Sequence, residues 1–268
     1  MANVEKNNNG MRLFVVIPHF IITEETAQLA RNAIKSFKET CDCTIINCDD
    51  ASPYDTEFLK EISDVYIRNE ENKGFAENCN VGFNWILENV KEDCWVVCAN
   101  NDIEVYEGWF EEFVKTADMF GADALGGYGY MDKIVEGRHI SEYKTNVGSL
   151  YNSSYVSEGG SSGDRLFPGG FYMIRKSLLE ECGLYDEVFQ NGYEDIDLFL
   201  RWKQMKKRLI MTPKVPYWHK EGATRFSDME RGRQSEDEIK NRAYFKQKHG
   251  FDAHEKMNTF LIDNRINQ

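Results

Sequence analysis

The chain has 268 residues, of which 41% are hydrophobic and 13% aromatic, which is enough for the core of one large α/β domain. Its 32 basic and 45 acidic residues give a net charge of -13, and this argues against a nucleic-acid partner because such surfaces carry a basic excess. Apolar runs reach about seven residues, far short of the roughly 20 of a membrane span, and the first residues lack a signal-peptide core. We expect a cytoplasmic protein, either free or peripheral at the inner membrane face.

The first half of the chain alternates apolar, β-branched runs with amphipathic helical patterns. Residues 1–10 are polar and Asn-rich, which predicts a disordered tail. The patterns then predict strands over 12–18, 44–47, 65–67, 95–99 and 124–127, with helices over 24–39 and 57–62, after Gly74, and over 109–119. Repeated βα units of this kind predict a parallel sheet with right-handed crossovers.

The second half has a different character. Gly, Ser, Asn and Tyr dominate residues 128–163, where a turn at Asp132-Lys133 predicts a hairpin followed by a long loop. Further along, we predict a strand and short helix ended by Gly183, a helix from 194, a strand over 209–211, a loop bearing Trp218 and His219, and a terminal amphipathic helix over 236–250.

Polar residues follow two of the predicted buried strands. Asn100, Asn101 and Asp102 come directly after strand 95–99, and Asp49 and Asp50 follow strand 44–47. Ligands of open α/β sheets bind outside the carboxyl ends of the strands, so both places are candidate sites. The alternative is a helix cap or turn, because Asn and Asp are common in both.

Several function classes lack their sequence motifs. The chain has no Walker A sequence and no GxSxG elbow, and GGYGY at 126–130 lacks the spacing of a dinucleotide site. The seven cysteines include no pair of CxxC elements at zinc-binding spacing, so we expect mainly buried thiols.

Seven motifs stand in a characteristic order, each at a predicted strand end or helix start. They are VVIPHF, CDDASPYDT, NKGFAENCNVG, ANNDIEV, PGGFYMIRKS, YEDIDLFLR and WHKEGATR. Over about residues 12–225 this set resembles the family 2 nucleotide-sugar glycosyltransferases of the GT-A fold, particularly the rhamnosyltransferase-like branch. The resemblance implies an α/β fold with a Rossmann-like, mostly parallel sheet flanked by helices. It also implies a nucleotide-sugar-binding half at 11–127, an acceptor-binding catalytic half at 128–225, and a helical segment at 226–268.

The resemblance implies a metal-assisted donor site. Asp102 occupies the last position of a motif similar to DxD and would bind Mn²⁺ or Mg²⁺, which offsets the charge of a diphosphate leaving group. Asn100 and Asn101 replace the customary acids, although an amide such as that of Asn101 can bond a ribose or sugar hydroxyl. His219 would be a second metal ligand; its alternative is a surface histidine, or one packed beside Trp218.

Further donor contacts follow from the same resemblance. Asp50 would accept a hydrogen bond from the imide of a pyrimidine base, and the backbone at Pro18 would contact that base. Lys73 would reach a phosphate or the base, and Asn80 matches a family asparagine near the donor. The alternatives are a solvated loop charge for Lys73 and a helix-surface residue for Asn80.

The resemblance also implies an inverting reaction in which a carboxylate takes a proton from the acceptor hydroxyl. Asp195 matches that general base, and Glu194 would bind the acceptor or hold the base in place. A structural explanation is also open, because acids are favoured at a helix amino end. Asp197 and Arg201, four residues apart, predict an intrahelical ion pair.

Three residues are assigned to the acceptor and sugar pocket. Gly169 and Gly170 would let the backbone approach the sugar closely, and Trp218 would line the pocket.

The overall prediction is a hexosyltransferase that moves a sugar from a UDP- or dTDP-type donor to a hydroxyl on a glycan, lipid-linked or protein-linked acceptor in polysaccharide biosynthesis. A homo-oligomer is left open. One alternative is a sugar nucleotidyltransferase, although the segment after the first strand lacks the glycine-rich basic loop of that class. The other is a non-catalytic carbohydrate-binding relative, suggested by the amides at Asn100 and Asn101.

Overall fold

The computed structural model describes residues 10–130, 134–135, 138–139, 163–164, 169–220 and 231–253. Its strands are β1 (Leu13–His19), β2 (Thr44–Asp49), β3 (Val65–Arg68), β4 (Trp95–Ala99), β5 (Ile103–Val105), β6 (Ala124–Tyr130), β7 (Ile134–Val135), β8 (Arg138–His139), β9 (Gly163–Asp164), β10 (Phe171–Arg175) and β11 (Leu209–His219). Its helices are α1 (Glu24–Thr40), α2 (Glu57–Ile62), α3 (Phe75–Asn89), α4 (Trp109–Phe120), α5 (Lys176–Cys182), α6 (Glu194–Gln204) and α7 (Arg231–His249).

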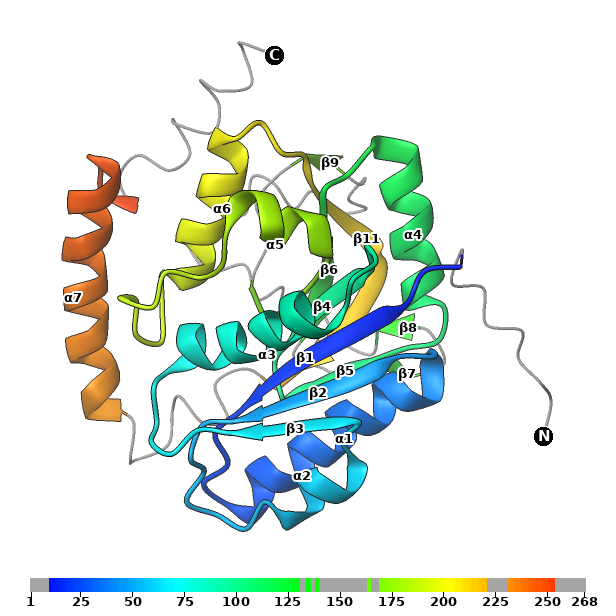
Figure 1. Ribbon diagram of the computed structural model, residues 1–268, viewed down its shortest axis with the longest axis horizontal. Coiled ribbons are helices and arrows are strands. Elements are labelled where there is room, and N and C mark those ends of the chain that lie inside the picture. Colours follow the sequence, from blue (N-terminus) through cyan, green and yellow to red (C-terminus); the bar gives the residue numbers. More distant parts are fainter. Residues whose placement is uncertain are drawn as a thin grey trace.

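One sheet passes through the molecule in the order β3-β2-β1-β4-β10-β6-β11-β5, with β9 paired to β11 (Figure 1). The strands β3, β2, β1 and β4 are parallel, as the βα pattern predicts. β10 then enters antiparallel between β4 and β6, while β6 and β11 are parallel to each other. The α/β class with a mostly parallel, helix-flanked sheet is confirmed, although β5 pairs antiparallel with β11 as well.

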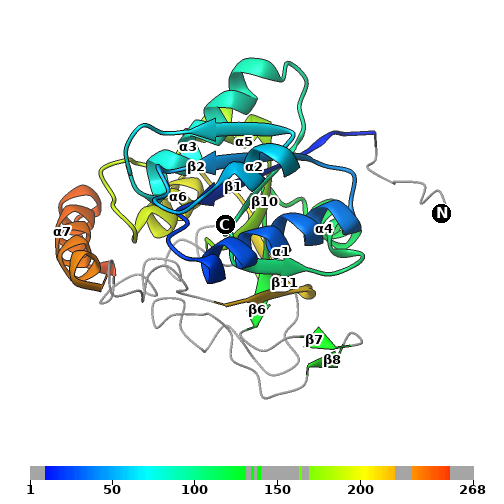
Figure 2. The same ribbon diagram turned by 90° about the horizontal axis from the view of Figure 1, so that it is seen from below.

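Helices cover both faces of the sheet (Figures 1 and 2). Successive side chains of a strand point to opposite faces, so Phe14 and Val16 of β1 join one buried core while Val15 and Ile17 join the other. The first core includes residues of α3, α5 and α6, and the second includes residues of α1 and α4. This double covering explains the continuous apolar runs of the central strands.

Local signals set the ends of several helices. Thr23 caps α1 in a capping box with Thr26, and Glu24 and Glu25 lie in the favourable first turn. Gly183 ends α5, where its backbone N–H donates to the Leu179 carbonyl. Both caps were predicted from the sequence.

The prediction of a loop at Trp218 and His219 is wrong, because both residues belong to β11, which is 11 residues long. Pro213 and Pro216 both lie within this strand. The register of β11 against β6 shifts between Met211 and Pro216, and prolines are tolerated in strands at such irregularities.

Two further differences concern short strands. β5 was not predicted, and it pairs with the end of β11, where His219 lies opposite Ile103. The turn predicted at residues 132–133 lies outside the described residues. β7 and β8 pair antiparallel, with Val135 opposite Arg138.

The predicted segments at the chain ends are described only in part. Residues 1–9 of the predicted tail lie outside the described residues, as do 226–230 and 254–268. In the described portion, no helix combines the length and apolar character needed to cross a bilayer.

Candidate active site

A cluster of polar side chains forms where β4 and β11 end. The backbone N–H of Asn100 donates to the Gly170 carbonyl at 2.8 Å, which joins the end of β4 to the turn before β10. His219, the last residue of β11, places Nε2 3.1 Å from Asp102 Oδ1 and 3.4 Å from Asn100 Nδ2. Asp102 and His219 are both buried. Segments 120 residues apart along the chain thus meet at one place.

The Gly169-Gly170 turn packs against this cluster so closely that larger residues would collide. A Cβ at Gly170 would lie 3.1 Å from His219 Cε1 and 3.3 Å from Asn100 Nδ2. A Cβ at Gly169 would lie 2.6 Å from the Cβ of Asp195, a distance that real structures do not show. Gly169 therefore permits the approach of the backbone to the start of α6, and Gly170 permits its approach to His219 and Asn100.

Asp195 is the more accessible of the two acids that begin α6. Its Oδ2 accepts a hydrogen bond from Gly169 N at 3.1 Å, and its Oδ1 accepts one from Ile196 N at 2.7 Å, while the side chain stays partly exposed. Glu194 is buried and accepts a hydrogen bond from Gly192 N. The geometry therefore gives Glu194 a role in shaping the loop and leaves Asp195 accessible to a substrate.

Asp50 organises the loop between β3 and α3. Its Oδ1 accepts hydrogen bonds from Asn69 Nδ2 at 2.8 Å and Lys73 N at 3.0 Å, and its Oδ2 accepts one from Gly74 N at 2.9 Å. Burial raises the pKa of Asp50, and these hydrogen bonds oppose the rise only in part. Three of the acceptor positions of this carboxylate already bind protein groups. The contact of Asp50 with a nucleotide base stays a prediction.

Asp49 supports the turn after β2. It accepts hydrogen bonds from Ser52 N at 3.0 Å, Thr56 Oγ1 at 2.9 Å and Tyr66 OH at 2.7 Å, and it pairs with Arg68. Burial alone would raise the pKa of Asp49, but these hydrogen bonds lower it overall. The first acid of the DD pair is therefore structural.

Two of the predicted donor residues bind other parts of the protein. Lys73 Nζ lies 2.6 Å from Glu77 Oε1, one helical turn away, and remains partly exposed. Asn80 is buried, and its Nδ2 donates to Tyr185 O and Glu187 Oε1, both at 2.9 Å. Both amide hydrogens of Asn80 are thus used to hold α3 against the segment that follows α5.

The loop that Asp50 organises meets the segment that precedes Asp195. The backbone N–H of Phe75 donates to Asn191 Oδ1 at 3.4 Å, and a Cβ at Gly74 would lie 3.1 Å from Gln190 Oε1. The regions of Asp50, Asp102 and Asp195 are therefore connected through short contacts at one end of the sheet, although Asp50 joins the others indirectly.

The remaining predicted residues line the same edge. Pro18 is buried near the end of β1, in register with Cys48, and Asn101 is partly exposed in the turn between β4 and β5. Trp218 is buried in β11, in register with Glu104.

The residues beside Asp102 fit a divalent cation in the chemistry of their donor atoms. Asp102 offers a carboxylate, His219 an imidazole, and Asn100 a buried Oδ1 atom that has no hydrogen-bond partner among the described residues. Such oxygen and nitrogen donors suit Mn²⁺ or Mg²⁺, and the single negative charge predicts modest affinity. Among the described residues, no three His, Cys, Asp or Glu side chains group as a metal site, so the Asn100 amide would be needed.

Sequence reasoning missed two asparagines that shape the site. Asn191 receives the hydrogen bond from Phe75, and Asn241 of α7 bonds the loop at 190–192. Neither lies in a motif, so no local signal pointed to them.

The fold and this cluster define a class. A parallel β3-β2-β1-β4 unit, with the acidic motif after β4 and an antiparallel β10 beside it, is the architecture of the GT-A glycosyltransferases. The model of the family "Glycosyl transferase family 2" matches residues 15–183, so the chain belongs to this family. Asp195, His219 and α7 lie beyond the matched residues. No curated protein matches the chain in a sequence comparison.

Solved structures show the same fold at low identity. GalNAc-T7 with UDP, GalNAc and Mn²⁺ aligns with a TM-score of 0.58 and 16% identity over 78% of this chain and 44% of that one. S. aureus TarS 1–349 with UDP aligns at 0.54 and 14% over 78% of this chain and 60% of that one. A second TarS 1–349 structure aligns at 0.53 and 14% over 90% and 74%. The chain thus spans less than two thirds of the first two.

Proposed function

We propose that the chain transfers a sugar from a nucleoside diphosphate sugar to a hydroxyl acceptor, with inversion at the anomeric carbon. The observation that carries this proposal is the meeting of Asp195 with the Asp102–His219 pair across the Gly169-Gly170 turn. A partly exposed carboxylate thus lies near a set of donor atoms suited to a diphosphate-bound cation. The structural neighbours crystallised with UDP support a UDP-type donor over a dTDP-type donor.

The reaction needs a proton acceptor on the side of the incoming hydroxyl. The acceptor oxygen would attack the anomeric carbon from the face opposite the diphosphate, and the bond from that carbon to the diphosphate oxygen would break. The hydroxyl proton would pass to Asp195, whose carboxylate is held by Gly169 N and Ile196 N. The nucleoside diphosphate leaves with the bonding electrons. One bond from the anomeric carbon to oxygen replaces another, so no redox partner is required.

The leaving diphosphate gains negative charge as the bond breaks. A divalent cation, Mn²⁺ or Mg²⁺, would offset this charge when bound by Asp102 and His219 with Asn100. His219 would bind the cation through a ring nitrogen.

The identity of the acceptor and the location of the enzyme are also part of this proposal. We propose a hydroxyl of a glycan, carried on lipid or protein or part of a growing polysaccharide, with the enzyme in the cytoplasm or peripheral at the inner membrane face.

A panel of nucleotide sugars, incubated with Mn²⁺ and glycan acceptors, tests the proposed reaction. Release of nucleoside diphosphate together with a glycosylated product supports it. Pyrophosphate-dependent formation of a nucleoside triphosphate would instead identify a nucleotidyltransferase, and donor binding without turnover would identify a carbohydrate-binding relative.

Asp195→Asn tests the general base. We expect transfer to fall by about 10³-fold, within the usual range for loss of general acid–base catalysis, with donor affinity in calorimetry changed less than about twofold. Glu194→Gln is the matched comparison and should lose less activity, because Glu194 is buried. The assignment is wrong if Glu194→Gln abolishes transfer and Asp195→Asn does not.

A further inference from the structure

The C-terminal helix α7 is hydrogen-bonded to the loop that leads into Asp195. Asn241 of α7 is buried, and its Nδ2 donates to Gln190 O at 2.7 Å and to Gly192 O at 2.8 Å. Its Oδ1 accepts a hydrogen bond from Gln190 N at 3.2 Å. One side chain therefore binds three backbone groups of the loop, three to five residues before Asp195.

This loop has a backbone that needs external support. Asn191, Gly192 and Tyr193 have φ angles of 51°, 152° and 71°, three consecutive residues in the region that L-residues rarely adopt. Such conformations persist where the surrounding structure over-determines them, and they cluster at functional sites. The loop ends at Glu194 and Asp195, so its conformation sets the direction in which α6 begins.

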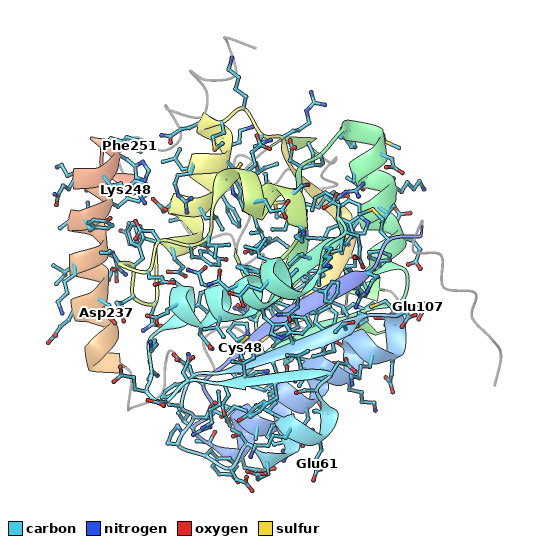
Figure 3. The ribbon with its side chains drawn as sticks, viewed as in Figure 1. Cys48, Glu61, Glu107, Asp237, Lys248 and Phe251 are labelled. Carbon is cyan, nitrogen blue, oxygen red and sulfur yellow. The ribbon has the colours of Figure 1, made fainter. Side chains whose placement is uncertain are left out.

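α7 lies on the same side of the molecule as α6 in both ribbon views (Figures 1 and 2), and side-chain contacts attach it there. Asp197 of α6 is fully buried and lies 2.7 Å from Lys248 Nζ and 2.8 Å from His249 Nε2. Tyr244 packs on Phe189 with ring centroids 5.0 Å apart. Figure 3 shows Lys248 and Phe251 near one end of α7, with Asp237 further along the helix.

The same loop also touches the donor side of the site. Asn191 Oδ1 accepts the hydrogen bond from Phe75 N, directly after the loop that Asp50 organises. A shift of the segment at 190–193 would therefore move the base relative to the segment that we propose for donor binding.

We infer that Asn241 is a positioning residue for the reaction, acting through the backbone at 190–192 to set the place of Asp195. The inference rests on the proposed function, and it assigns α7, which lies outside the family match, a part in catalysis. Because a misplacement of about 1 Å far from the chemistry can cost about 10²-fold in rate, loss of these hydrogen bonds should lower turnover more than substrate binding.

The test compares Asn241→Leu and Asn241→Asp with wild type. Asn241→Leu removes all three hydrogen bonds, and Asn241→Asp retains only the acceptor for Gln190 N. We expect kcat to fall by about 10- to 100-fold in both, with KM for the donor sugar nucleotide within about threefold. Hydrogen–deuterium exchange of the peptides over 189–197 should rise in both variants.

Tyr244→Phe is the matched control on the same helix, because it removes a 3.0 Å hydrogen bond to Asp186 while the ring keeps its packing on Phe189. It should leave kcat unchanged. Raised exchange over 189–197 with an unchanged kcat would overturn the inference, as would unchanged exchange. If wild type transfers no sugar from any donor, the proposed function fails, and with it the catalytic role of Asn241, whereas the exchange measurement separately decides whether Asn241 fixes the loop.

Discussion

Two aspartates that follow strands on either side of β1 serve different purposes, although the sequence presents them alike. The carboxylate of Asp50 accepts three hydrogen bonds from the loop between β3 and α3. Asp102 instead faces the imidazole of His219 beside an amide oxygen of Asn100 that has no partner in the described part of the chain. The partners of a carboxylate, and not its place after a strand, decide whether it shapes a loop or remains available to a cation.

Asp102→Ala should remove metal-dependent donor binding. With the carboxylate gone, only neutral donors remain for the cation, so we expect Mn²⁺ to strengthen UDP binding in the wild type but not in the variant. Calorimetric titration of UDP with Mn²⁺ and with EDTA measures this difference. Glu107→Ala, which changes an exposed acid labelled in Figure 3, should behave as wild type. An unchanged titration of Asp102→Ala would refute the metal role.

Gly169→Ala should displace the base without a change in its chemistry. The added Cβ would lie 2.6 Å from the Cβ of Asp195, so the turn or the start of α6 must move. We expect kcat to fall by about 10²-fold, as for other small misplacements. Steady-state kinetics measure the loss, and Gly108→Ala, where a Cβ would have open space, is the comparison without a collision. Full activity of Gly169→Ala would contradict this prediction, because it would show that the turn can move without displacing Asp195.

His19 predicts a pH dependence of stability. Burial lowers the pKa of His19 from 6.5 to about 4, against the opposing hydrogen bond of Asn47 and the charge of Asp49. Between these two pKa values the unfolded chain binds a proton that the folded chain does not, so stability is full above about pH 6.5 and falls toward pH 4.

Urea unfolding at pH 7 and pH 5 measures the effect. The wild type should lose about 2 kcal/mol more than His19→Gln over this interval, since one pKa unit corresponds to about 1.4 kcal/mol. Equal losses in the two proteins would contradict a neutral, buried His19.

At the scale of elements, β11 and α7 decide the site. β11 extends past Pro213 and Pro216 and delivers His219 to the end of β4, where a loop had been predicted. α7 has few apolar positions for its length, yet it docks through Asn241 and through Lys248 and His249 on Asp197. Both elements act through polar contacts that hydrophobic periodicity does not reveal.

Lys248→Met tests the docking of α7. Burial would raise the pKa of Asp197, but His249, Lys248 and Arg201 lower it overall, so its stabilising contribution is present above about pH 4 and is lost as the pH falls through the folded-state value. Removal of Lys248 should cost about 1 to 2 kcal/mol at pH 7, and the difference from wild type should shrink below pH 3.

Urea denaturation across this pH range measures the effect. Lys246→Met, an exposed lysine of the same helix, is the control and should be neutral. A difference that persists unchanged at pH 2.5 would mean that the lost stability comes from packing and not from the buried charge.

At the scale of the whole molecule, the sheet contains strands that local sequence patterns predict and strands whose placement depends on distant contacts. The strands β1 to β4 and the helices between them follow from apolar runs, alternation and caps, which are local properties of the sequence. β10 runs antiparallel into the middle of this sheet, and that placement depends on contacts between segments far apart along the chain. The motif order predicted the family because each motif lies at the end of a local element.

Fewer of the site contacts were predictable. The residues Asp102, Asp195, Gly169, Gly170 and His219 were selected from the sequence, and the structure brings them together. Asn80 and Lys73 were also selected, but they bind Tyr185, Glu187 and Glu77. A motif identifies a residue, whereas the partner that uses its hydrogen bonds is found only in three dimensions.

The sequence by itself determined the α/β class, the positions of most elements and the family, because periodicity, capping and motif order act over a few residues. Only the tertiary structure decided that His219 ends a strand, that Asp50 holds a loop, and that Asn241 supports the backbone before Asp195. These are hydrogen bonds between segments tens to more than a hundred residues apart, and they leave no periodic trace in the chain.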